Sequence, residues 1–223
     1  MSDYQQPIVR EGALQQPVEQ ADARAVFGQV MGLVAVTVGF FALGAYLARH
    51  LTGSTGLLFF IAAFACVFGA NVASKRSEPL AITLLFGIGL FIGLALGPVL
   101  AYYAKSDPAV LWQSGGATAL FVGALGSYGY ATRRDLSSWA RSLFWLLIGL
   151  IVFGIVLIFV NIPGGRLIYA VLGLAIFGAY TIFDFNRLRR ANMDQSVPIA
   201  VGIFLDVVNI FLFFLQIFGG GRR

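Results

Sequence analysis

The chain has 223 residues, of which 59% are hydrophobic and only 11% charged, and its mean hydropathy is +0.85. Soluble domains carry about 25% charged residues, so this composition excludes a soluble globular protein and indicates an integral membrane protein. The formal net charge of +5 would favour nucleic acid as the partner of a soluble chain. Here the basic residues lie between hydrophobic runs, where membrane topology explains them. We therefore expect a lipid bilayer around the protein and no nucleic-acid partner.

The alternation of polar and apolar segments predicts an all-α, polytopic membrane protein with seven transmembrane helices. Residues 1–25 are polar, have no periodic apolar face and are expected to form a flexible tail. The transmembrane domain then covers residues 26–218, and a short basic tail covers residues 219–223. Each apolar run approaches the roughly 20 residues that a hydrocarbon core about 30 Å thick requires. The predicted spans are 28–48, 57–73, 80–104, 110–131, 140–161, 167–185 and 197–218.

Small residues at helical spacing occur in two of the early runs. The first run contains Gly28 and Gly32, and the third contains Gly89, Gly93 and Gly97 followed by Pro98. Glycines four residues apart let the backbone of a neighbouring helix approach closely, and an internal proline is expected to kink its helix. We interpret both patterns as packing features.

The basic residues between the runs predict the orientation of the chain. With seven spans, the N-terminal segment and every second connection share one side of the membrane, and that side holds ten of the fifteen Lys and Arg residues. Cytoplasmic connections carry the excess of positive charge. The N-terminus is therefore expected in the cytoplasm and the C-terminus outside.

The last run, 197–218, contains a single formal charge, Asp206, near its middle. A carboxylate at that depth costs at least about 2.5–3.5 kcal/mol, so an intramembrane acid is by default a functional residue. Asn209 and Gln216 lie three and ten residues further on and share its helix face. This polar stripe must face protein or water. The last helix is therefore expected at the centre of the bundle.

A second acid, Asp184, lies near the cytoplasmic end of the sixth run. The sixth and seventh runs are joined by a short loop, which favours antiparallel neighbours, although the two acids differ in depth by about 5–10 Å. If the carboxyls meet, burial and like-charge repulsion make double ionisation costly, and the pair is expected to share a proton. Ionised, Asp184 and Asp206 would be the metal ligands, offering hard oxygens to a cation such as calcium.

Structural explanations compete with this interpretation. Asp184 could form an ordinary helix-end ion pair with Arg187, three residues on. Asp206 could be a permanently protonated, hydrogen-bonded packing residue. Lys75 or Arg76, at the end of the second run, could reach either carboxylate or serve only as a topology anchor.

Enzymatic chemistry has little support in the sequence. The single Cys66 and the single His50 cannot form a metal-ligand set. No phosphate-binding loop occurs, and Asp206 lacks the Gly-x-Gly-Asp setting of intramembrane aspartyl proteases. We expect no enzymatic activity and no cofactor.

Several segments resemble one family in the same order along the chain. They are Gly97-Pro98, residues 126–137 (GSYGYATRRDLS), Asp184-Phe185-Asn186 and residues 205–211 (LDVVNIF). This set is similar to the Bax inhibitor family, the transmembrane Bax-inhibitor-motif proteins. The resemblance implies seven helices with the last one central, in a bacterial member located in the inner (plasma) membrane.

The resemblance also implies a function. The aspartate pair, here Asp184 and Asp206, would be the pH-responsive gate of a passive calcium leak, with calcium and protons as the bound ions. Arg76 would latch this gate, and Asn209 and Arg187 would support it. The alternative is a membrane regulator that moves no ions and binds other membrane proteins, such as a quality-control protease. Retention of both aspartates favours the first function.

Overall fold

All regular secondary structure in the residues that the structure describes is helical. The computed structural model describes residues 11–51 and 55–220, with side chains from residue 23 onward, and these segments contain no strand. A short 3-10 helix, η1 (Met193–Gln195), precedes the last of the seven long helices. The long helices are α1 (Glu11–Leu47), α2 (Thr55–Ala73), α3 (Glu78–Ser106), α4 (Pro108–Ala131), α5 (Trp139–Phe159), α6 (Gly165–Leu188) and α7 (Ser196–Gly220).

All seven predicted spans are confirmed as helices, and each is long and apolar enough to cross a bilayer. In α1 the apolar part is Ala23–Leu47. The third span continues as a helix through Pro98. The sixth runs further than predicted, to Leu188, so Asp184 lies one turn inside α6 rather than at its end. The chain is thus an all-α, polytopic membrane protein, as predicted.

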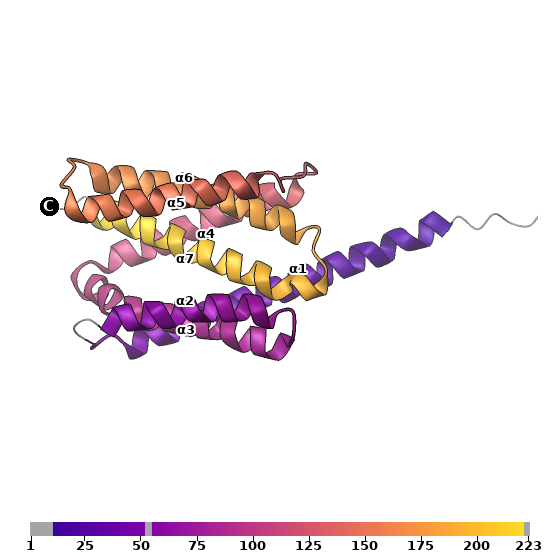
Figure 1. Ribbon diagram of the computed structural model, residues 1–223, viewed down its shortest axis with the longest axis horizontal. Helices are drawn as coiled ribbons and strands as arrows, with labels where there is room; N and C mark the ends of the chain where they lie inside the picture. Colours follow the sequence, from indigo (N-terminus) through magenta and orange to yellow (C-terminus); the bar gives the residue numbers. More distant parts are fainter. Residues whose placement is uncertain (1–10, 52–54, 221–223) are drawn as a thin grey trace, which may run out of the picture.

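The start of α1 differs from the prediction. The segment expected to be a tail up to residue 25 is already helical from Glu11, and this part of α1 extends out of the bundle (Figure 1). Its residues are mostly Ala, Glu, Gln and Leu, which are good helix formers, and they continue a helix that the span nucleates. Residues 1–10 and 221–223 of the two predicted tails lie outside the described residues.

Helix α7 lies at the centre of the bundle, as the polar stripe predicted. It packs against α6, α4, α1, α3 and α2, whereas α5 packs mainly on α6. Figure 1 shows α7 crossing between a layer that contains α5 and α6 and a layer that contains α2 and α3. In its most apolar part 56% of the residues are buried, against 11% in α5. The protein is therefore built around its last helix.

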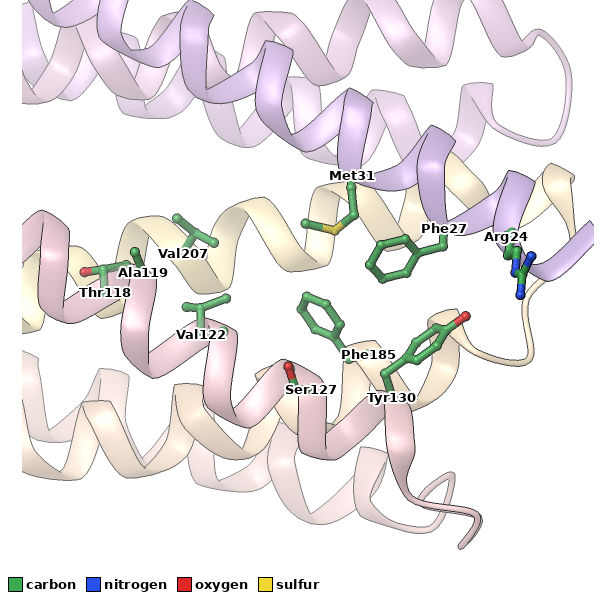
Figure 2. Close-up of a pocket in the computed structure, with 12 residues that line it drawn as sticks. Arg24, Phe27, Met31, Thr118, Ala119, Val122, Ser127, Tyr130, Phe185 and Val207 are labelled. Carbon is green, nitrogen blue, oxygen red and sulfur yellow. The ribbon is translucent and has the colours of Figure 1, made fainter. Parts of the chain in front are cut away.

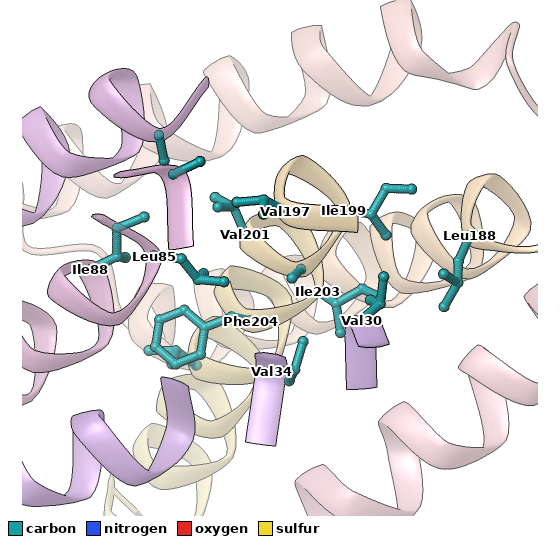
Figure 3. Packing of buried hydrophobic residues seen from close by; sticks show 14 of the residues in the cluster. Val30, Val34, Leu85, Ile88, Leu188, Val197, Ile199, Val201, Ile203 and Phe204 are labelled. Atoms are coloured by element: carbon teal, nitrogen blue, oxygen red, sulfur yellow. The ribbon is translucent and has the colours of Figure 1, made fainter. Parts of the chain in front are cut away.

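Two apolar clusters hold the two halves of α7. The N-terminal half packs with α1, α2 and α3, and Phe204 and Ile203 of α7 lie against Leu85 and Val30 in this cluster (Figure 3). The C-terminal half packs with α5 and α6 through side chains that include Ile210. Lipid tails are as apolar as these side chains, so close packing holds the clusters together. Asp206 lies on α7 within the stretch that the first cluster covers, between its members Phe204 and Val208.

The glycines of α3 form a groove for α1. A Cβ atom at Gly89 or Gly93 would overlap the backbone carbonyl oxygen of Thr37 or Phe41, respectively. Gly44 of α1 approaches the α3 backbone in the same way. The prediction of close packing is therefore confirmed for α3. It is wrong for Gly28 and Gly32, which have nothing within 4 Å of a built Cβ, because they lie on a face of α1 away from α3.

Candidate functional site

Asp206 is almost completely enclosed at the centre of the bundle. Only 4% of the residue is exposed, and its neighbours Ile203, Phe204 and Ile210 on α7 are fully buried. The Thr181 hydroxyl of α6 is the hydrogen-bond partner of the carboxyl. Its Oδ2 atom is buried and has no partner among the described residues. Since buried polar atoms are nearly always paired, this oxygen marks a place where a proton or a cation can bind.

Thr181 has two competing acceptors. Its Oγ1 also lies 2.9 Å from the carbonyl oxygen of Phe177, one turn earlier in α6. A hydroxyl carries one hydrogen and can donate only one such bond at a time. When Asp206 is ionised, Thr181 can donate to the carboxylate. When Asp206 is protonated, the acid can donate to Thr181, which then donates to Phe177. The hydroxyl can thus serve both protonation states.

Asp184 is buried in the contact between α6 and α7. It is 7% exposed, and its Oδ2 lies so close to Gly202 that a Cβ atom there would overlap it. Gly202 lies four residues before Asp206 on α7, which is about 6 Å along the helix. The expected difference in depth therefore exists and is about one helical turn. Because Gly202 has no side chain, the Asp184 carboxyl can approach the backbone of α7 at this level.

The two acids interact electrostatically across this turn. The Tyr180 side chain lies within electrostatic range of both. Among the described residues, no third Asp, Glu, His or Cys joins them to form a group of metal ligands. The site can hold a shared proton, or it can offer carboxylate oxygens to a hard cation whose other ligands would be water or neutral oxygens.

The three predicted supporting residues are placed differently from one another. Arg187, although exposed, acts electrostatically on Asp184, but among the described residues the two do not form the ion pair that their spacing allowed. Asn209 donates to the Leu205 carbonyl of its own helix at 2.8 Å and does not hydrogen-bond either carboxyl. Arg76 is exposed in the turn between α2 and α3, and among the described residues it forms no ion pair with either acid, so the structure does not bring it to the pair. Its position at the end of a span is that of a topology anchor.

Three consecutive residues near the end of α6 face three different neighbours. Asp184 faces Gly202 of α7, and the Phe185 ring packs on Gly126 of α4, where a Cβ atom would meet it at 3.0 Å. Asn186 is 1% exposed, and its Nδ2 lies 3.1–3.3 Å from three carbonyl oxygens at the end of α4 and in the following loop. This short segment therefore fixes the position of α6 against both α4 and α7.

The hydrogen bonds of Asn186 to the end of α4, here called the α4 anchor, are extended by an ion pair in the loop between α4 and α5. Arg190 lies 2.7 Å from Asp135 and also donates to Oδ1 of Asn186 at 2.6 Å. Hydrogen bonds from Ser137 and Arg190 hold the pKa of Asp135 well below its usual range. Asp135 therefore stays ionised at any pH near neutrality, and the anchor does not titrate there.

The sequence interpretation missed Gly202, Thr181 and Asn186. The spacing could have pointed to two of them. Thr181 lies three residues before Asp184, and Gly202 lies four residues before Asp206, so each shares a helix face with an acid. Asn186 was noted only as part of a family motif. Its role depends on the α4 carbonyls, and no spacing within α6 reveals these.

The fold and the site together define a class: a seven-helix membrane protein with a buried acid pair on its last two helices. Residues 23–223 match the sequence profile of the family described as "Inhibitor of apoptosis-promoting Bax1". The chain therefore belongs to the Bax inhibitor family, and the resemblance seen in its motifs is confirmed.

The chain is also similar to curated proteins along most of its length. A Helicobacter pylori (strain ATCC 700392 / 26695) relative is 29% identical over 203 residues, which cover 86% of this chain and 87% of the relative. The Escherichia coli K12 inner membrane protein YbhL is 26% identical over 236 residues, covering 96% and 98%. The vaccinia virus (strain Lister) Golgi anti-apoptotic protein is 30% identical over 166 residues, covering 74% and 65%.

Proposed function

We propose that the chain is a pH-sensitive passive calcium leak of a bacterial inner membrane, gated by Asp184 and Asp206. The observation that carries the proposal is the burial of two carboxyls from consecutive helices, one turn apart, with an unpaired oxygen on Asp206. Intramembrane acids are expensive and mark ion or proton pathways. The inner membrane location is inferred from the E. coli relative, which is named an inner membrane protein.

The proposed mechanism is competition between protons and calcium for the same oxygens. With both carboxyls ionised, the site carries two negative charges and attracts a divalent cation. With protons bound, the charge falls and the oxygens are engaged in hydrogen bonds, including the one with Thr181. Calcium takes about six to eight oxygen ligands, so two carboxylates alone make a transient site, which suits an ion in transit. No covalent chemistry and no cofactor enter this proposal.

Cavities near both ends of α6 and α7 support a path that is closed in this conformation. One of about 420 Å³ is lined by Arg187, Arg190 and Gln195, one turn from Asp184. The other, of about 720 Å³, is lined by Tyr103, Arg166 and Gln216, near the C-terminal end of α7. Between them the fully buried side chains around Asp206 fill the bundle. Opening would therefore require α6 and α7 to separate.

Calcium flux into dye-loaded liposomes, measured across a range of pH, tests the proposal. The wild-type protein should conduct calcium above the level of empty liposomes, and its flux should depend on pH. Asp184→Asn and Asp206→Asn should each weaken or abolish this dependence, because an amide cannot take up the proton. Asp194→Asn, an exposed acid in the connection before α7, is the matched control and should behave as wild type.

Two negative outcomes have different meanings. Absence of flux at every pH would overturn the leak itself. It would leave the alternative of a regulator that binds other membrane proteins, such as a quality-control protease, without moving ions. Flux that keeps its pH dependence in both Asp variants would overturn only the gate.

A further inference from the structure

A groove lined mainly by α1 and α4 forms one of the cavities in the described part of the chain. It has a volume of about 740 Å³ and is apolar along most of its length. Helix α1 packs on α3 and α7, and α4 packs on α6 and α7, so the groove lies where α1 and α4 separate and α7 forms its floor. Figure 2 shows side chains of α1 and α4 facing one another across it. The lining residues used below are Arg24, Phe27, Gly123, Tyr130, Phe185 and Val207.

The polar groups of the groove gather at one end. Arg24 lies in the first turn of the α1 span, and Figure 2 shows its guanidinium and the Tyr130 hydroxyl at the same end. Phe27 and Tyr130 meet across this end with ring centroids 5.1 Å apart. Arg24 is exposed and forms no ion pair with any side chain that the structure describes. An arginine and a tyrosine hydroxyl together can donate several hydrogen bonds to a phosphate.

The length of the groove matches one leaflet of the bilayer. Its lining on α4 runs from Thr118 to Tyr130, about 18 Å of helix. Half of a hydrocarbon core is about 15 Å. The part of α4 before Thr118 does not line the groove, so a transmembrane helix of a partner would find a surface that ends near mid-membrane. A single lipid chain extending from the Arg24 end needs no more than this length.

We propose that the groove between α1 and α4 binds one anionic phospholipid, with an acyl chain along Val207 and Gly123 and the phosphate at Arg24 and Tyr130. The predicted orientation places Arg24 on the cytoplasmic side, where the leaflet carries anionic lipids that attract basic side chains. The floor of the groove includes Phe185 and Val207, the chain neighbours of Asp184 and Asp206. Binding of the lipid does not depend on the proposed calcium leak.

Gly123 is a suitable position for a substitution that blocks the groove. A Cβ atom at this position has nothing within 4 Å, so a Gly123→Leu side chain begins in open space and extends into the groove. Gly116 is the matched control. It lies two turns earlier on the same helix, is also exposed and also has open space around a built Cβ, but it does not line the groove.

Native mass spectrometry of the full chain tests the proposal. The detergent-purified protein is titrated with phosphatidylglycerol or phosphatidylcholine that carry identical acyl chains. Wild type should retain one phosphatidylglycerol in preference to phosphatidylcholine. Arg24→Gln should reduce this preference about fivefold, the contribution expected of one basic side chain near an anionic lipid. Gly123→Leu should reduce binding of both lipids, whereas Gly116→Leu and Arg166→Gln, at the opposite membrane face, should bind as wild type.

The same spectra report the outcomes that would overturn the proposal. Wild-type phosphatidylglycerol binding in Arg24→Gln would remove the headgroup site, and wild-type binding of both lipids in Gly123→Leu would place the lipid elsewhere. A loss of dimer mass in Gly123→Leu with unchanged lipid binding would identify the groove as an interface between copies. Asp206→Asn should keep wild-type lipid binding, which separates this test from that of the leak.

Discussion

The carboxyl of Asp184 rests on the α-carbon of Gly202, and this contact places it one helical turn from Asp206. Any side chain at position 202 would occupy the space that an oxygen of Asp184 now fills. The place of the Asp184 carboxyl against α7 therefore depends on a residue that has no functional group. This contact leads to the first prediction.

Gly202→Ala should displace Asp184 and alter the pH response of calcium flux. The added methyl overlaps Oδ2 of Asp184, so either the carboxyl rotates away or α6 and α7 separate. Overpacking of this kind costs about 1–3 kcal/mol of stability. Flux in liposomes and thermal unfolding in detergent measure the two effects. Gly116→Ala, where a Cβ has open space, should leave both unchanged, and a wild-type pH profile in Gly202→Ala would contradict the prediction.

Thr181→Val should move the pH response of the flux to higher pH. The substitution removes the hydroxyl that can donate to ionised Asp206, so the carboxyl keeps its proton over a wider range. The shift is measured as the midpoint of flux against pH. Thr37→Val is the matched control, since Thr37 is fully buried and its hydroxyl donates only to a carbonyl of its own helix, that of Leu33. Equal midpoints in Thr181→Val and wild type would refute a role for Thr181.

Asn186→Ala should lower the stability of the protein by about 1–3 kcal/mol, the usual cost of leaving a buried polar group without its partner. The carbonyls at the end of α4 and in the next loop lose the amide that now pairs with them. Thermal unfolding in detergent measures the loss. Asn209→Ala should lose less, because the amide of Asn209 bonds only within its own helix. A smaller effect for Asn186 than for Asn209 would show that the α4 anchor is unimportant.

Asp135→Asn should leave the midpoint of the pH response unchanged. Hydrogen bonds from Ser137 and the charge of Arg190 lower the pKa of Asp135 in the folded protein, so its ionised form stabilises the fold. This contribution is fully present above the ordinary aspartate pKa of about 3.9 and is lost only as the pH falls below it. Between pH 5 and 8 Asp135 therefore contributes a constant amount. Flux measured over that range checks the prediction, and a moved midpoint would place part of the pH sensor in the α4–α5 loop.

Much of the fold could be predicted because membrane insertion depends on local properties. Run length and hydropathy decide where a span lies, and these can be read without knowing any neighbour. The central position of α7 could be predicted from Asp206, because lipid cannot solvate a charge at that depth and the helix must therefore face protein or water. The glycines of α3 were predictable as a packing surface, although their partner was not.

Side-chain partners could not be predicted in the same way, because they depend on how helices rotate against each other. Gly28 and Gly32 have the same spacing as the α3 glycines, yet they face away from α3. Arg76 and Arg187 both lie at span ends that the sequence predicts to be cytoplasmic, and only the structure shows that Arg187 is the one that acts on Asp184. The start of α1 at Glu11 was not predicted. Its first residues are polar and show no periodic apolar face, so nothing in their pattern indicates that they continue the helix.

The central position of α7 also determines how the molecule is assembled. The ribosome makes α7 after the other six helices. α1, α2 and α3 can already hold one another through their glycine contacts, and α4, α5 and α6 can form a second group. The two groups meet chiefly on α7. The two groups can therefore pack into one bundle only after α7 is made, so the seven-helix bundle cannot close before the helix that carries Asp206 is inserted.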